Sequence, residues 1–134
     1  MAIEQTKFRF KGYRVIKSEM RIDQDVEIGK KLNVTFSGVQ AVEHESEYLL
    51  DLGVDITNED KSIDIKLEMR GVFEFDKEME HDEKGRFFIL NAPTIMFPYM
   101  RAHVATLTAI SGIEALVLPT LNFAEGLRKA KEID

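Results

Sequence analysis

The residue types that most often act in catalysis or metal binding are few in this sequence and widely spaced. The three histidines, His44, His81 and His103, have neither an i, i+4 partner nor the HExxH context of a zinc enzyme. A zinc site needs ligands at a defined spacing, and a catalytic histidine needs a group that orients it. We therefore expect these histidines to be ordinary polar or half-buried residues.

Carboxylates gather in one charged segment of the chain, at Asp76, Glu78, Glu80, Asp82 and Glu83. This cluster lacks the ligand order and the central glycine of a calcium loop, so a solvated linker is the better interpretation. The chain contains no cysteine, which excludes thiolate metal sites and cysteine nucleophiles. It also has no nucleophile elbow, phosphate-binding glycine loop or dinucleotide fingerprint. We expect no enzyme activity, no metal and no cofactor.

The composition indicates one globular domain that spans residues 1–134. Apolar residues make up 44% of the chain, charged residues make up 31%, and the formal net charge is −6. That charge disfavours sequence-independent binding to nucleic acid and docking on an anionic membrane, and no apolar run is long enough to insert into a bilayer. The absence of cysteine is typical of a reducing compartment, and no signal peptide is visible. We expect a cytoplasmic protein.

Four segments within residues 7–76 alternate apolar and polar side chains as β-strands do. These segments are residues 7–22, 31–43, 48–57 and 63–76. The alternation slips near Gly12, which predicts a β-bulge, and it is lost near Gly38. One apolar and one charged face is typical of an antiparallel sheet with a solvated side. Short polar linkers at 44–47 and 58–62 predict hairpins, so we expect a four-stranded meander.

A single long helix is predicted at about residues 93–110, where apolar side chains recur at three- and four-residue spacing. Pro93 fits the first turn of this helix, whereas Pro98 either kinks it or restarts it after a bend. Gly112 suits the left-handed cap position that follows the last turn.

The other segments after the strands carry weaker signals. Residues 77–86 are expected to form a charged linker or a short helix. A short amphipathic helix is predicted after Asn122, because Glu125 completes a capping box with it. Strands followed by a helical part at about 91–132 indicate an α+β domain, with one long and one short C-terminal helix packed on one face of the sheet.

The connector between the two predicted helices, residues 113–121, is unusually apolar. It carries Ile113, Leu116, Val117, Leu118 and Leu121. Connectors normally run over the surface, where such side chains would be exposed to water. Two interpretations remain open: the connector packs on its own sheet as core, or it forms part of a binding surface.

Two stretches of this C-terminal half resemble a known family. They read PTIMFPYMRAHVATLTAISG at 93–112 and LVLPTLNFAEGL at 116–127. The Phe97, Pro98, Tyr99 run with Arg101 two positions later, the pairs Leu118-Pro119 and Asn122-Phe123, and Leu127 are similar to the SecB family of protein-export chaperones. Upstream, Gly71, Val72 and Phe73 and the order of four strands followed by two helices also fit. The chain is identified as a divergent, SecB-like member.

The resemblance implies a chaperone that binds unfolded or non-native polypeptides in apolar grooves, without a cofactor. It implies a homotetramer built as a dimer of dimers, with the long helix at the subunit interfaces and the connector beside the client groove. The candidate structural or interface residues are Phe97, Pro98, Tyr99, Arg101, Val104 and Leu107. The candidate client contacts are Leu32, Val34, Phe36, Leu116, Leu118 and Leu121.

Two departures from the family pattern qualify the role in protein export. Family members dock the export motor ATPase through acidic residues on the outer face of the sheet, whereas this chain has Lys66, Ile16 and Lys17 near the corresponding positions. This difference makes motor docking doubtful. The connector also begins with Ile113 and Glu114 instead of the usual phenylalanine and proline. An adaptor with one dedicated protein or peptide partner is therefore the alternative, and a small-ligand binder is a third hypothesis.

Overall fold

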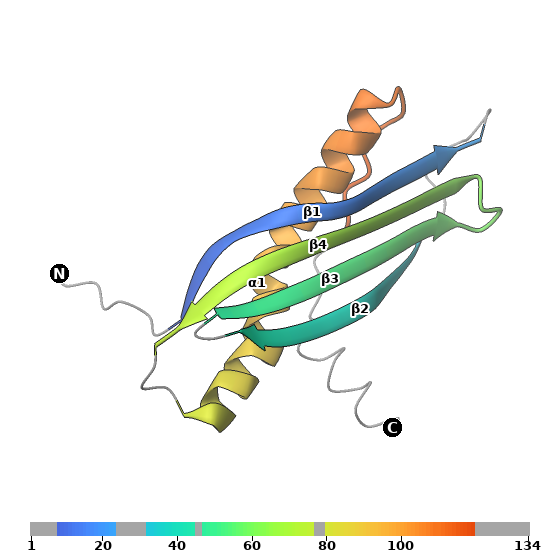
Figure 1. Ribbon diagram of the computed structural model, residues 1–134. Coiled ribbons are helices and arrows are strands. Elements are labelled where there is room, and N and C mark those ends of the chain that lie inside the picture. The colour runs from blue at the N-terminus through green and yellow to red at the C-terminus, as the bar shows by residue number, and fades with distance from the viewer. Residues whose placement is uncertain (1–7, 24–31, 45–46, 77–79, 120–134) are drawn as a thin grey trace.

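The computed structural model describes residues 8–23, 32–44, 47–76 and 80–119. The described chain forms one antiparallel sheet of four strands and one long helix that crosses a single face of it (Figure 1). The elements are β1 (Phe8–Ile22), β2 (Leu32–His44), β3 (Glu47–Asn58), β4 (Ile63–Phe75) and α1 (His81–Ile110). The predicted α+β class is confirmed. The second helix expected after Asn122 lies outside the described residues.

The strands lie in the order β1-β4-β3-β2. Strands β2, β3 and β4 form the predicted meander, but β1 pairs with β4 and not with β2, so the expectation that β1 and β2 are neighbours is corrected. Residues 23–31 separate these two strands, which is more than a tight hairpin needs. The two strands lie about 14 Å apart, three strand spacings, and an extended segment of that length reaches about 30 Å.

Strand β1 keeps its apolar side chains on the helix side by means of two register shifts. The first lies between Phe10 and Gly12, at the predicted bulge, and the second between Val15 and Lys17. Gly12 has φ +143°, a conformation that side chains with a Cβ rarely adopt. Each bulge adds one residue and so reverses the alternation. A similar shift in β2, between residues 37 and 40, accounts for the loss of alternation near Gly38.

Helix α1 begins at His81, twelve residues before the predicted start at Pro93, and contains both prolines. This is a correction to the sequence prediction, which treated Pro93 as an entry marker. Proline costs a helix about 3 kcal/mol, but packing can offset that cost, and Ala92 and Met96 are fully buried on either side of Pro93. The predicted end is confirmed: α1 stops at Ile110, and Gly112 has φ +87°.

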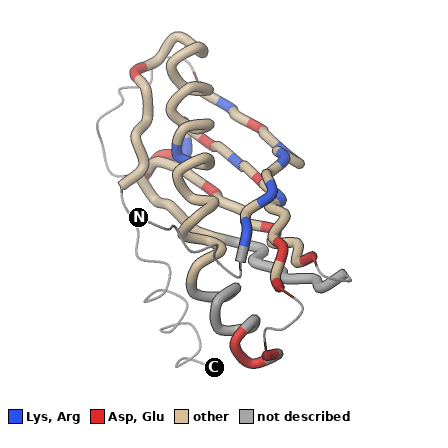
Figure 2. The backbone as a smooth tube through the Cα atoms, turned by 90° about the vertical axis from the view of Figure 1, so that its left-hand side faces the viewer, with Lys and Arg blue, Asp and Glu red and all other residues tan. Residues whose placement is uncertain are grey.

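The core fills the space between α1 and the apolar face of the sheet. Charged residues recur along the strands (Figure 2), and in β3 and β4 they alternate with the buried positions. Strands β3 and β4 alternate buried and more exposed residues along most of their length. Both outer strands add partly buried residues at the margins of this core. The buried apolar side chains of the strands are those of Tyr48, Leu50, Leu52, Val54, Ile56, Ile63, Ile65, Leu67, Met69, Phe73 and Phe75.

Candidate functional site

The three client-contact candidates on β2 lie together on the helix side of the sheet. Leu32, Val34 and Phe36 are partly buried and pack against the core. The Phe36 ring meets Phe97 of α1 edge-on, with 5.9 Å between the ring centroids. Among the described strands, β2 is an outer strand that pairs only with β3. The three residues therefore form an apolar strip, the β2 strip, along one edge of the sheet.

The connector splits into buried and exposed residues. It folds back along α1 (Figure 2), with Leu116 5% exposed and Leu118 fully buried in the core. Between them, Val117 is 63% exposed. The candidate contacts Leu116 and Leu118 thus fill the core of their own chain, and Leu121 lies outside the described residues. Their role as client contacts stays a prediction.

A buried hydroxyl holds the connector against the helix. The Leu116 backbone N–H donates a hydrogen bond of 2.8 Å to Thr108 Oγ1, and that hydroxyl donates to the Val104 carbonyl at 2.8 Å. Thr108 is fully buried, so both of these hydrogen bonds are shielded from water. A buried polar group without partners is destabilising, and this arrangement satisfies the hydroxyl within the fold.

The helix residues implied by the resemblance point in different directions. Phe97 and Val104 are buried against the sheet, Arg101 and Leu107 are half-buried, and Pro98 and Tyr99 are exposed. The outward side of α1 is largely apolar or small. We call the part of it from Pro98 onward the outer helix strip, and its exposed residues are Pro98, Tyr99, Ala102, Thr106, Ala109 and Ile110.

Contacts between β1 and α1 were not anticipated from the sequence. Tyr13 and Tyr99 have ring centroids 4.8 Å apart, and Phe10 lies 5.5 Å from Tyr99. Ser18 Oγ is 3.0 Å from His103 Nε2, so this histidine has a polar partner in the fold. The shifts of alternation in β1 were the only sequence signal for these contacts. They indicate which residues change face, but they do not identify the element that packs against that face.

Cross-strand ion pairs cover the sheet face opposite α1. Arg70 holds Asp51 with two hydrogen bonds of 2.7 and 2.9 Å, and Arg9 bonds Glu74 at 2.9 Å. The Arg9 guanidinium, with Lys11 beside it, holds the pKa of the Glu74 carboxyl below its usual value. The hydrogen bonds that Arg70 donates to the Asp51 carboxylate raise the pKa of Arg70. Exposed pairs of this kind each contribute little to stability, because water screens them.

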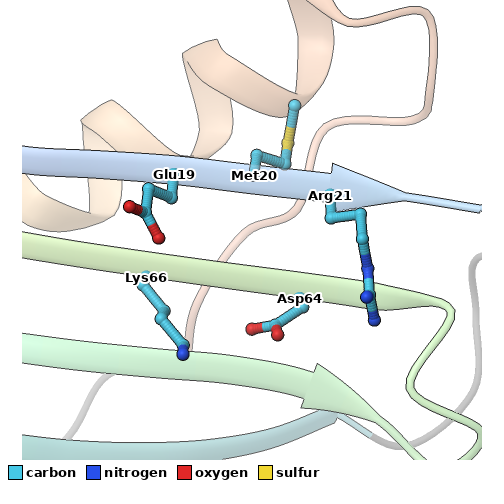
Figure 3. Close-up of a pocket in the computed structure, with 5 residues that line it drawn as sticks. All are labelled: Glu19, Met20, Arg21, Asp64 and Lys66. Carbon is cyan, nitrogen blue, oxygen red and sulfur yellow. The ribbon is translucent and has the colours of Figure 1, made fainter.

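A small hollow on this face, lined by β1 and β4 side chains, includes the position where the family pattern expects an acidic docking residue. Glu19, Arg21, Asp64 and Lys66 lie along it, and Met20 turns toward the helix side (Figure 3). Two carboxylates and two cations make it electrically balanced. Asp64 Oδ1 is shielded from solvent and has no hydrogen-bond partner among the described residues. The hollow thus lacks the acidic character that the family resemblance implies for a docking surface.

The described part of the chain holds neither a metal-binding cluster nor a membrane-spanning helix. Within it, His, Asp and Glu side chains do not gather in any group of three or more that could hold a metal ion. The helix found there is also not long and apolar enough to cross a membrane.

Comparison with known proteins assigns a family to the chain. Residues 15–132 match the family model described as preprotein translocase subunit SecB. The protein-export protein SecB of Orientia tsutsugamushi (strain Boryong) is 31% identical over 113 residues, 82% of this chain and 68% of the relative. That of Neorickettsia sennetsu is 27% identical over 121 residues, 84% of this chain and 70% of the relative. For the protein-export protein SecB of Anaplasma phagocytophilum, the match is 38% identical over 56 residues, 40% of this chain, and covers only 35% of the relative's length.

A solved structure shares the fold. It is a SecB-like chaperone of Mycobacterium tuberculosis in complex with a ChAD peptide from the HigA1 antitoxin. The two folds superpose with a TM-score of 0.71 over 86% of this chain and 91% of that one, at 13% sequence identity. The family match over most of the chain agrees with the strand order, the long helix and the connector, and the chain belongs to the SecB family.

Proposed function

We propose that this protein is a molecular chaperone that binds unfolded or non-native polypeptides. Its membership of the SecB family supports this function, and a SecB-like chaperone of the same fold has been solved with a bound peptide. The observation that carries the proposal is the β2 strip, where Leu32, Val34 and Phe36 stand half-buried along an outer strand.

The β2 strip suits an extended polypeptide for two reasons. An outer strand presents backbone N–H and C=O groups that an added strand can pair with, which provides affinity without regard to sequence. The apolar side chains on the helix side then select segments that carry apolar residues at alternate positions. Non-native chains expose such segments, whereas folded proteins bury them.

The proposed assembly is a homotetramer in the cytoplasm. The outer helix strip supports it, because Tyr99 is 41% and Ile110 76% exposed in the single chain. Large exposed apolar patches commonly mark contacts with other proteins. For protein export we propose only that the protein holds clients, and not that it docks on the motor ATPase. The reason is that Lys66 stands where an acidic residue would dock the motor.

An aggregation assay with matched variants tests the client site. We expect the protein in molar excess to slow aggregation of a denatured reporter and to bind a labelled unfolded peptide. Leu32→Thr combined with Val34→Thr removes apolar surface from the β2 strip while it keeps strand propensity. This double variant should bind the peptide about tenfold more weakly, which corresponds to about 1.4 kcal/mol.

The control is Asn33→Thr, which changes the same strand on its opposite, exposed side. It should bind as the parent does, and thermal unfolding of each variant verifies the fold. Failure of the parent protein to slow aggregation or to bind the peptide contradicts the proposal. Recovery of one stoichiometric partner, in place of many clients, would favour the adaptor function.

A further inference from the structure

The charge of the protein is unevenly distributed across the sheet face opposite α1. The chain as a whole has 18 Lys and Arg against 24 Asp and Glu. Strand β1 reverses this ratio, because its only acidic residue is Glu19 and its cations are Arg9, Lys11, Arg14, Lys17 and Arg21. An edge strand that is strongly basic within an acidic protein needs a physical explanation beyond solubility.

Ion pairs within the sheet satisfy most of these cations but not all of them. Arg9 and Lys11 reach Glu74, Lys17 reaches Glu19, and Arg21 reaches Asp23. Among the described residues, Arg14 forms no ion pair.

Arg14 also faces a charge of the same sign. Its register partner on β4 is Arg70, and like charges directly opposite each other destabilise an antiparallel pair. The Arg70 guanidinium donates to both carboxylate oxygens of Asp51 on β3, so Asp51 already has a cationic partner. Arg14 is therefore an exposed cation with a like charge as its register partner and no ion pair among the described residues.

The surroundings of Arg14 form an open hollow with both charged and apolar walls. Lys11, Arg14 and Arg70 contribute three cations to it, and Glu47 contributes one carboxylate. Val72 and Ile16 provide apolar surface, and Ile16 is 49% exposed. Gly12 has no side chain and nothing within 4 Å of where a Cβ would stand, so the hollow stays open at this point.

We propose that this hollow, the Arg14 hollow, binds an acidic segment of another polypeptide that carries an apolar residue beside its carboxylates. The carboxylates pair with Arg14 and Lys11, and the apolar side chain packs on Ile16 and Val72. Charge complementarity selects the partner, because the guanidinium of Arg14 offers a carboxylate a fork of donors, and among the described residues no carboxylate occupies it. The hollow lies on the face opposite the β2 strip, so it does not depend on the proposed client function.

A fluorescence anisotropy titration tests this assignment. The probe is a short labelled peptide of alternating glutamate and leucine, and its matched control replaces each glutamate with glutamine. The glutamate peptide should bind more tightly, and its affinity should fall as salt rises, because exposed charges are screened over about 10 Å at ordinary ionic strength. Arg14→Glu should weaken its binding about tenfold.

The control variant is Arg21→Glu, which makes the same charge change on the same strand outside the hollow. Seven residues of strand place it about 23 Å from Arg14, beyond the screening length. Arg21→Glu should keep the affinity for the glutamate peptide within about twofold of that of the parent. An equal loss of affinity in both variants would mean general charge attraction and would overturn the proposed site. Binding of the two peptides with equal affinity, or of neither, would overturn it as well.

A second readout separates binding from a structural role. Arg14→Gln removes a like-charge neighbour of Arg70, so the melting temperature should stay the same or rise while the affinity for the glutamate peptide falls. A lowered melting temperature together with unchanged affinity would assign Arg14 to the stability of the sheet instead. Arg14→Glu, Arg14→Gln and Arg21→Glu should all bind the unfolded peptide as the parent protein does. This test is therefore distinct from the test of the chaperone function.

Discussion

At the residue scale, Gly71 sets how closely the helix approaches the sheet. It lies on the helix side of β4, and a Cβ added there would stand 2.5 Å from Met96 Sδ and 3.0 Å from Phe73 Cε2. Met96 is fully buried, so its side chain has little space to move away. Glycine at this position is thus a packing requirement, since its backbone does not need a positive φ.

Replacement of this glycine should destabilise the fold. We expect Gly71→Ala to lower the free energy of unfolding by about 1–3 kcal/mol, because the added methyl group overpacks the space beneath Met96. Gly85→Ala is the matched control: nothing lies near its Cβ position and it is within α1, so it should stabilise by about 0.5–1 kcal/mol. Urea unfolding measures both, and a neutral Gly71→Ala would show that Met96 repacks freely.

A second residue-scale prediction concerns acid and the Glu74 carboxyl. The folded pKa of Glu74 is lower than its ordinary value near 4.5, so the ion pair stabilises the fold above that value. The contribution is lost as the pH falls through the folded pKa. Glu74→Gln should melt slightly below the parent at neutral pH, and the two melting temperatures should converge as the pH falls below about 4.5.

The control for this pH profile is Glu68→Gln on the same strand. Among the described residues Glu68 forms no ion pair, so its variant should follow the parent at neutral pH. A difference between Glu74→Gln and the parent that stayed constant from neutral to acidic pH would contradict the assignment to this carboxyl.

At the element scale, the connector after α1 belongs to the core and to the surface at once. Leu118 is fully buried while its neighbour Val117 is 63% exposed. The connector therefore runs extended, with alternate side chains facing the sheet and the solvent. The core interpretation holds for Leu116 and Leu118, whereas the binding-surface interpretation of the connector stays a prediction.

These neighbouring residues provide a direct comparison. Leu118→Asp should lower the free energy of unfolding by about 3 kcal/mol or more, because it places an unpaired carboxylate in an apolar core. Val117→Asp should change it by about 0.5 kcal/mol or less, since its side chain is already in water. Denaturant unfolding measures both variants, and equal effects would mean that the connector is not held against the sheet.

At the scale of the whole molecule, the outer helix strip and the charged sheet face differ in chemical character. The first presents Tyr99, Ala102 and Ile110 to solvent, and the second is covered by ion pairs. Apolar surface at this density calls for a partner surface, whereas a charged face can remain in water. Assembly through α1 would leave the Arg14 hollow and the β2 strip on other parts of the subunit.

Light scattering at micromolar concentration tests the assembly. We expect a tetramer for the parent protein and a smaller particle for Ile110→Glu, because a charge in a buried interface is unfavourable. Glu68→Lys, which reverses a charge on the opposite face, is the control and should leave the tetramer intact. Circular dichroism should show the same fold for all three proteins. A parent protein that is monomeric would contradict assembly through α1.

The sequence by itself determined the strands, their apolar faces and the end of the helix. In β3 and β4 the alternation is regular because one face meets the core and the other meets water. The residue types follow this contrast, with apolar side chains on the first face and polar side chains on the second. Gly12 and Gly112 identified a bulge and a helix cap for the same local reason, since both adopt positive φ values. The SecB resemblance was also visible, because the matching residues are close together in sequence.

Only the tertiary structure decided which elements meet. Alternation shows that β1 has an apolar side, but its pairing with β4 depends on the path of the intervening chain. The helix continues through Pro93 because burial of Ala92 and Met96 offsets the local cost. The burial of Leu118 and the isolation of Arg14 opposite Arg70 depend on neighbours distant in sequence. The local sequence determines whether a side chain needs an apolar or an oppositely charged neighbour. The fold determines whether such a neighbour is present.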